Sequence, residues 1–212
     1  MGSMWLVSDS SLERRLETHP SDKRRHLSTR SAWAAAALVD GAPTRWLTSG
    51  DRSRLRARLS GPSTTDTQTY QWWLRSRSSM TRYRLAATDI IELMATHGVV
   101  AGGISAASAY SLGLGHGAEA EIYTDAATAR RLVDEFFLIE SERGNLALHV
   151  VDGPDPWHQR VAQEVNGVLV APRLIVAADL LDSDDTRSRS AGAQLLSTAL
   201  STLDDRRERL AS

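Results

Sequence analysis

Apolar positions in the first third of the chain recur at helical intervals, and runs of β-branched residues are scarce there. The pattern predicts a short charged helix over 12–17 and a longer helix that begins at Ser28 or Thr29 and continues through Leu38. The sequence Asp-Gly-Ala-Pro at 40–43 is expected to end this second helix. This part of the chain is therefore predicted to be helical with polar connections.

A third helix is predicted after Ser49 or Asp51, because Leu55 and Leu59 lie four residues apart on one face. Its other faces carry Arg52, Arg54, Arg56 and Arg58. A helix, a turn and an arginine-rich helix are compatible with a helix-turn-helix. These four arginines are accordingly candidate contacts for DNA or for an acidic protein.

Arginines and aromatic residues also alternate between positions 70 and 84. Arg75 and Arg77 follow the pair Trp72 and Trp73, which suits a nucleic-acid surface where cations contact phosphates and rings stack on bases. The alternative is that Trp73 belongs to a core while the arginines point outward. Both interpretations leave Arg75 and Arg77 as candidate contacts for DNA or a protein partner.

From position 88 onward, short apolar runs alternate with segments of helical periodicity. Strands are predicted at 99–103, 122–124, 136–140, 146–151 and 168–170, with a hairpin-like turn at 142–145. Helices are predicted at 88–97, 105–114, 126–135, 172–181 and from 183 or 184 towards the C-terminus. The predicted fold class is α+β or α/β, with a helical N-terminal domain followed by a mixed α/β domain that contains a small sheet.

The charge of the chain changes sign at about the same position. Residues 1–84 carry 15 Lys and Arg against 7 Asp and Glu, whereas residues 85–212 carry 10 against 19. We therefore expect a basic domain over 4–84 and an acidic domain over 85–212. The basic part suits an acidic partner, either nucleic acid or protein; the alternative is two solvated surfaces of unlike sign.

Composition excludes several classes of site. The absence of cysteine excludes disulfides, thiolate catalysis and zinc–thiolate sites. No apolar run reaches the roughly 18 residues that span a bilayer, and no signal-peptide pattern is present, so a cytoplasmic protein without membrane contact is expected. The six histidines show no short metal-ligand spacing and are interpreted as core or surface side chains.

A candidate phosphate site lies at a predicted strand-to-helix turn that contains Gly102, Gly103 and Ser105. Glycines let backbone N–H groups approach a phosphate, and the N-terminus of a helix favours an anion. The alternative is that the two glycines only permit close packing of neighbouring elements.

Three carboxylates are candidates for metal binding near this turn. Glu119 and Glu121 are separated by one residue at the start of the next predicted strand, so their side chains point to the same side. Asp152 ends a later strand and would complete a set of Mg²⁺ ligands. The order of these features resembles a nucleotidyltransferase core, although such enzymes usually carry Asp where this chain has Glu. The alternative is that both glutamates simply face solvent.

Two segments of the predicted α/β domain carry a family resemblance. The first is Ile-Ser-Ala-Ala-Ser-Ala-Tyr-Ser-Leu-Gly-Leu at 104–114, and the second is Val-Ala-Pro-Arg-Leu-Ile-Val-Ala-Ala-Asp-Leu-Leu at 170–181. Together they resemble the C-terminal domain of AbiEi-type antitoxins, over about residues 85–203. The resemblance implies an antitoxin that neutralises a nucleotidyltransferase-fold toxin encoded beside it. Many such antitoxins also bind their own promoter.

In length and arginine content the chain is most similar to mycobacterial antitoxins of this group that are described as atypical serine protein kinases. That similarity implies phosphorylation of a toxin serine with Mg-ATP, with the glycine turn at the ATP phosphates and the three carboxylates on Mg²⁺. Glu121 and Asp152 would then be catalytic, near the attacking hydroxyl. The alternative is a DNA-binding autorepressor that neutralises the toxin by direct binding, without catalysis.

Overall fold

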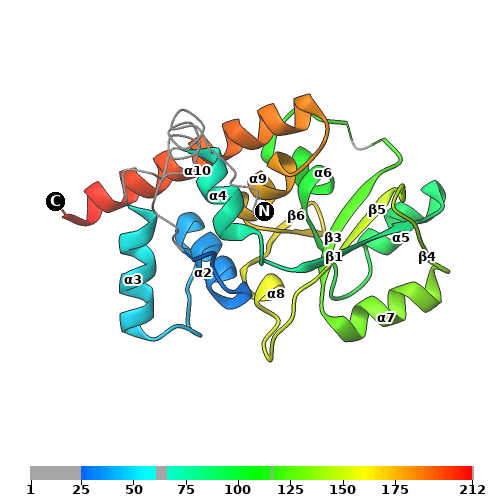
Figure 1. The fold of residues 1–212 in the computed structure, drawn as a ribbon, viewed down its shortest axis with the longest axis horizontal. Helices are drawn as coiled ribbons and strands as arrows, with labels where there is room; N and C mark the ends of the chain where they lie inside the picture. The colour runs from blue at the N-terminus through cyan, green and yellow to red at the C-terminus, as the bar shows by residue number, and fades with distance from the viewer. Residues whose placement is uncertain (1–24, 61–65, 116, 212) are drawn as a thin grey trace, which may run out of the picture.

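The computed structural model describes residues 25–60, 66–115 and 117–211, which form helical layers on the two faces of one mixed β-sheet (Figure 1). Helices precede the sheet in the sequence and alternate with its strands thereafter, so the predicted fold class is confirmed. The helix predicted over 12–17 lies outside the described residues. In the part of the chain that is described, no helix has the length and apolar character needed to cross a membrane.

Within the described residues the sheet has the strand order β4-β1-β5-β3-β2-β7-β6. The strands are β1 (Ser79–Arg84), β2 (Val100–Ala101), β3 (Ala120–Thr124), β4 (Ile139–Glu140), β5 (Leu146–Val150), β6 (Gln163–Val165) and β7 (Val168–Val170). β3 and β5 are parallel, as are β2 and β7, and the other neighbours are antiparallel. Asn166 and Gly167, both with positive φ, form the two-residue turn between β6 and β7.

Strand β1 was not predicted from the sequence, and it changes the organisation of the sheet. It lies between β4 and β5 and pairs antiparallel with both, so the predicted hairpin of β4 with β5 across 142–145 is wrong. The expected boundary at residue 84 would also separate β1 from the sheet to which it is hydrogen-bonded. The change of charge along the chain therefore does not mark a boundary in the hydrogen-bonded structure.

The helices before the sheet begin close to their predicted positions. They are α2 (Thr29–Asp40), α3 (Ser49–Leu59) and α4 (Thr67–Leu74). The Ser28 side chain accepts a hydrogen bond from the Ser31 amide and so caps α2, as predicted. Helix α3 is capped by Thr48, one residue before the predicted Ser49. Gly41 ends α2 in the left-handed conformation that glycine adopts without strain.

The remaining helices connect the strands and close the fold, and the last of them is the longest. They are η2 (Ala87–Asp89), α5 (Ile90–Met94), α6 (Gly103–Ala106), η3 (Ala107–Tyr110), α7 (Ala126–Glu135), α8 (Trp157–Val161), α9 (Arg173–Leu181) and α10 (Thr186–Ala211). Asp125 caps α7 by accepting from the amides of Ala127 and Thr128, as the sequence predicts. The helix predicted at 105–114 is shorter, because α6 passes into a 3-10 turn that ends at Tyr110.

Alternate residues of the strands face two separate hydrophobic cores. On one face, Ile122 and Leu148 pack with Leu132 of α7 and Leu93 of α5. On the other face, Tyr123 belongs to a larger core that extends from α2 and α4 through α9 to α10. In this core α2 is buried from Ala32 to Val39, and the apolar residues of α9 are buried with it. The larger core thus joins segments from both charge halves of the chain.

Candidate functional site

One face of the sheet lines a cavity of about 540 Å³. The strand register places Glu121 of β3 beside Ala147 of β5, and His149 two residues further along β5 points to the same face. Other residues on the cavity walls are Arg75, Arg77, Ser78, Met80, Arg82, Glu119, Asp179 and Asp182. The volume falls in the range of roughly 300–1,000 Å³ that is typical of small-molecule sites.

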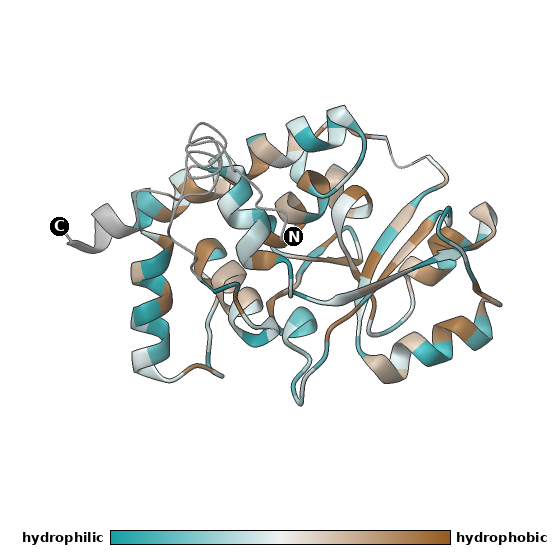
Figure 2. Ribbon diagram, viewed as in Figure 1, coloured by the Kyte–Doolittle hydropathy of each residue, from teal (hydrophilic) through white to brown (hydrophobic). Residues whose placement is uncertain are grey.

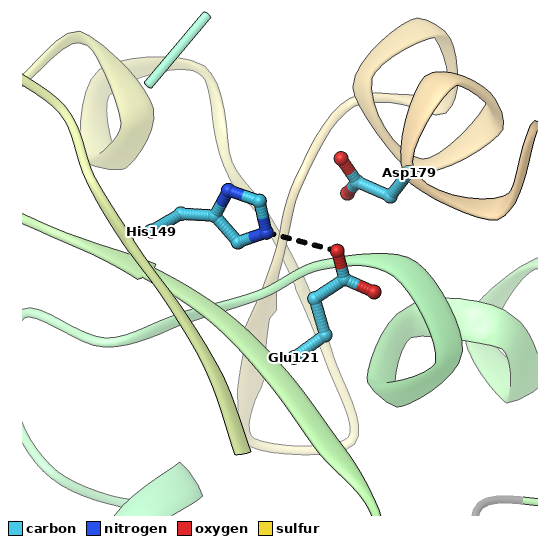
Figure 3. Close-up of side chains that lie close together, drawn as sticks. All are labelled: Glu121, His149 and Asp179. Atoms are coloured by element: carbon cyan, nitrogen blue, oxygen red, sulfur yellow. Dashed lines mark hydrogen bonds and ion pairs between the residues drawn. The ribbon is translucent and has the colours of Figure 1, made fainter. Parts of the chain in front are cut away.

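Glu121, His149 and Asp179 form a cluster on the wall of this cavity. Each contributes one oxygen or nitrogen atom, and these atoms all lie within 4.8 Å of one another. Figure 3 shows the Asp179 carboxylate, carried by helix α9, facing the hydrogen-bonded pair of Glu121 and His149 from two strands. The cluster therefore depends on the packing of α9 against the sheet.

A chain of hydrogen bonds links Ser78, His149 and Glu121. The Nε2 atom of His149 lies 2.9 Å from Oε1 of Glu121, and its Nδ1 atom lies 2.8 Å from Oγ of Ser78. An ionised carboxylate only accepts hydrogen bonds, so we assign the proton of the neutral imidazole to Nε2. Nδ1 is then an acceptor, and the Ser78 hydroxyl donates to it. A hydroxyl, a base and a carboxylate that orients the base form the arrangement that activates a nucleophile.

The position of the His149 ring is fixed by its surroundings. His149 is only 4 % exposed, and its ring stacks on Tyr123, with the ring centroids 4.4 Å apart and the planes 23° from parallel. Tyr123 in turn donates its hydroxyl proton to Oδ1 of Asp179 at 2.5 Å. Burial raises the pKa of Tyr123 well above its ordinary value, so the hydroxyl remains a donor. The His149 ring is thus held in one orientation by a hydrogen bond at each ring nitrogen and by the stacked Tyr123 ring.

Both oxygens of the Asp179 carboxylate accept hydrogen bonds from this chain. Its Oδ1 atom accepts from Nε of Arg77 at 2.8 Å as well as from Tyr123, and its Oδ2 atom accepts from the amide of Gly103 at 3.0 Å. Burial raises the pKa of Asp179, and the Arg77 guanidinium opposes that rise. Burial would lower the pKa of Arg77, but Tyr123, Asp179 and Asp182 hold it well above its ordinary value. Asp179 and Arg77 therefore form a buried ion pair behind the site.

These residues fit a Mg²⁺ ion poorly. Mg²⁺ prefers carboxylate and water oxygens in a regular octahedral arrangement. Here both Asp179 oxygens already accept hydrogen bonds, and the third member of the cluster is an imidazole that bonds to Glu121. A guanidinium in contact with Asp179 also disfavours a second cation at that carboxylate. The cluster is better described as a hydrogen-bonded network than as a magnesium site.

The carboxylates predicted to bind Mg²⁺ are only partly brought together. Glu119 and Glu121 both line the cavity, but Glu119 lies just before β3 and only Glu121 is within the strand. Asp152 lies five positions beyond Ala147, the partner of Glu121, which is roughly 16 Å along an extended strand. It is exposed and is not among the residues that line the cavity. The expectation that Asp152 lies beside the two glutamates is wrong, because β5 runs parallel to β3 and carries its C-terminal end away from them.

The glycine turn is used inside the protein. Gly103 donates its amide to Asp179, and Ser105 accepts the amide of Glu121 through Oγ at 2.8 Å. Gly102 and Gly103 are buried, and a Cβ on either would overlap a neighbouring side chain, Tyr123 or Glu121. The polar groups of the predicted phosphate site therefore make contacts within the chain. Gly102 and Gly103 permit close packing, as the alternative interpretation predicted.

The six arginines expected to contact DNA or a partner fall into two groups. Arg52 bonds to Thr44 and to the Leu47 carbonyl, Arg58 stacks over Trp73, and Arg77 is 5 % exposed in its ion pair. The prediction of a surface role is wrong for Arg77, because it neutralises a buried carboxylate. Exposed side chains are those of Arg54, Arg56 and Arg75. Trp73 is buried, which confirms the core interpretation for that residue.

Sequence reasoning missed Ser78, His149 and Asp179 as site residues. One signal was available for Asp179, because it is the single charged residue within the otherwise apolar run 174–181. A carboxylate in such a run is expected to be buried with a partner. For His149 the signal was weaker: it is the single polar residue in the apolar run 146–151. No pattern in the sequence pointed to Ser78.

Comparison with known protein families shows what the chain is similar to. The model of a protein family described as "Transcriptional regulator, AbiEi antitoxin, Type IV TA system" matches residues 46–201. The match begins before α3, so it includes much of the basic segment as well as the sheet, where the sequence resemblance was expected only from about residue 85. No curated protein and no solved structure matches the chain.

Proposed function

This chain belongs to the AbiEi antitoxin family of Type IV toxin–antitoxin systems, and we propose that it neutralises a nucleotidyltransferase-fold toxin by phosphorylating a toxin serine. Antitoxin function follows from the family; the identity of the toxin and the chemistry are the proposal. The observation that carries the chemistry is the hydrogen-bonded chain of Ser78, His149 and Glu121 on the wall of a cavity that also contains arginines.

In this mechanism His149 is the base that removes a proton from an attacking hydroxyl. Glu121 keeps the proton of the neutral ring on Nε2 and stabilises the imidazolium that forms when Nδ1 takes the hydroxyl proton. Arg75 and Arg82 are exposed and line the same cavity, so they are placed to neutralise phosphate charge. Phosphoryl transfer depends mainly on such positioning and charge neutralisation. Because the Glu121, His149 and Asp179 cluster fits Mg²⁺ poorly, none of these steps uses it as a metal ligand.

Transfer of label from γ-³²P-ATP to the purified cognate toxin tests the proposal. His149→Gln and Glu121→Gln are expected to reduce the rate by about 100-fold or more, because they remove the base or its orienting partner. Asp152→Asn is expected to retain the rate, since Asp152 lies away from the cavity. Glu142→Gln, at an exposed turn, is the matched control for loss of a carboxylate. Undiminished transfer in His149→Gln would remove the dyad from the mechanism.

A second candidate function is repression of the antitoxin's own promoter. The family description includes the words "Transcriptional regulator", and α3 exposes Arg54 and Arg56. Figure 2 shows α3 as largely hydrophilic along its length, at the end of the molecule opposite α7. DNA bound there would lie away from the cavity, so promoter binding and toxin phosphorylation are compatible. A gel shift with the promoter tests this second function.

A further inference from the structure

We propose that Ser78 is the first acceptor of the phosphoryl group, so that the antitoxin forms a phosphoserine and then passes the group to the toxin. This inference rests on the proposed phosphoryl transfer and names the hydroxyl through which it proceeds. Neither the family nor the sequence assigns a role to Ser78.

The Nδ1 atom of His149 is the base for the first transfer. The Nε2 atom of His149 is hydrogen-bonded to Glu121, so Nδ1 is the atom that can take a proton from a hydroxyl. That atom is already in contact with Oγ of Ser78 at 2.8 Å. A hydroxyl from the toxin would have to displace Ser78 to reach it. The geometry therefore activates a hydroxyl of this chain before it activates one from a partner.

Ser78 also has access to a substrate. Its side chain is half-buried and lines the cavity, where it lies on the same side of the chain as Met80 and Arg82 at two-residue steps. Arg75 lines the cavity as well, so two exposed arginines share the cavity with the hydroxyl. A nucleoside triphosphate is the substrate class that such cations fit, because guanidinium groups bind phosphate oxygens in pairs.

The neighbouring Ser79 shows why position 78 is distinctive. Ser79 is exposed, and its hydroxyl points back to the carbonyl of Val150, across the β1–β5 pair. Successive residues of an extended chain face opposite sides, so Ser79 does not face the cavity. Ser79 therefore provides a matched control with the same chemistry one position away.

The phosphoryl group is transferred in two steps. Oγ of Ser78 attacks the γ-phosphorus of the triphosphate, the bond from that phosphorus to the bridging oxygen breaks, and the nucleoside diphosphate leaves. The hydroxyl proton passes to Nδ1 of His149. In the second step the toxin hydroxyl attacks the phosphoserine, the Oγ–P bond breaks, and His149 returns its proton to Oγ. The proton of the toxin hydroxyl goes to solvent, so one proton is released per transfer.

A pulse-chase experiment tests the inference with the full chain and its toxin. The antitoxin alone is incubated with γ-³²P-ATP and acid-quenched, and peptide mass spectrometry locates the label; toxin and excess unlabelled ATP are then added to a parallel sample. We expect label on Ser78 in the pulse and its movement to the toxin in the chase. Ser78→Ala should lose both labels by about 100-fold or more, whereas Ser79→Ala should keep both. Ser78→Thr, which retains a hydroxyl, should restore part of the transfer, and thermal melting identifies any variant that has not folded.

The possible results distinguish failure of the phosphoserine step from failure of the proposed function. Toxin labelled by folded Ser78→Ala at the wild-type rate would overturn the phosphoserine step and leave toxin phosphorylation intact. Label on the antitoxin at another residue that chases to the toxin would also overturn it. If the wild-type antitoxin inactivates the toxin while neither protein takes up label, both this inference and phosphorylation as the neutralising reaction are overturned.

Discussion

Arg77 and Asp179 are 102 positions apart in the sequence, and Nε of Arg77 lies 2.8 Å from Oδ1 of Asp179 in the folded protein. Arg77 also donates from a second nitrogen to Asp182 at 2.8 Å, at the C-terminal end of the same helix, α9. It precedes Ser78 directly, so the ion pair fixes the segment that carries the candidate nucleophile against α9. A basic residue from one charge half and an acidic residue from the other thus meet within the fold.

Replacing Arg77 by Met is expected to destabilise the protein by about 3–5 kcal/mol, because it leaves the buried Asp179 carboxylate without its cation. The double variant Arg77→Met with Asp179→Asn should lose less than the single variant, since no buried charge is then left unpaired. Urea unfolding measures both free energies. A single variant with wild-type stability would show that the pair contributes little.

Replacing Gly103 by Ala is expected to cost about 1–3 kcal/mol, because Gly103 has a φ of +35° and its Cβ would overlap the Glu121 carboxylate. Displacement of Glu121 should also slow toxin phosphorylation. Gly50→Ala in α3 is the control, since a Cβ there meets only the end of the Arg54 side chain at 3.8 Å. Thermal or urea unfolding of the two variants, with the labelling assay, checks both effects. Equal stability of the two variants would contradict the close approach at Gly103.

Stability is expected to fall on acidification because of His158. Burial lowers the pKa of this side chain from 6.5 to about 4. Above pH 6.5 the side chain is neutral in both states, but between pH 6.5 and 4 the unfolded chain binds a proton that the folded protein does not. The free energy of unfolding should therefore decrease over this window by up to about 3 kcal/mol. Urea unfolding at several pH values should show a shallower decrease in His158→Gln; identical slopes would exclude His158 as a source.

Promoter binding, if α3 mediates it, should weaken when its exposed arginines are removed. Arg54→Gln and Arg56→Gln should each weaken binding and reduce the dependence of log K on log salt concentration by about one, as expected for loss of one phosphate contact. Arg143→Gln is the control, because it lies in the connection after β4, and β4 is at the opposite end of the molecule from α3 (Figure 1). Retardation that is unchanged in both α3 variants would place the DNA contact elsewhere.

The sequence by itself determined the features that depend on near neighbours. Ser28 and Asp125 cap their helices because a side-chain oxygen reaches amides only two or three residues away. The alternation of helices and strands after residue 88 likewise gave the fold class.

Only the tertiary structure decided which of these elements meet. Strand β1 escaped prediction because its exposed residues alternate with half-buried ones, so it lacks an apolar face. Its insertion beside β5 brings Ser78 to His149, and the parallel pairing of β3 with β5 brings His149 to Glu121 while it carries Asp152 away. Interactions between residues a few positions apart determine the helix caps and the alternation of side chains along a strand. Strand order and strand direction depend instead on burying two hydrophobic cores at once. The site is made by those long-range pairings, and for that reason its members could not be identified from their spacing along the chain.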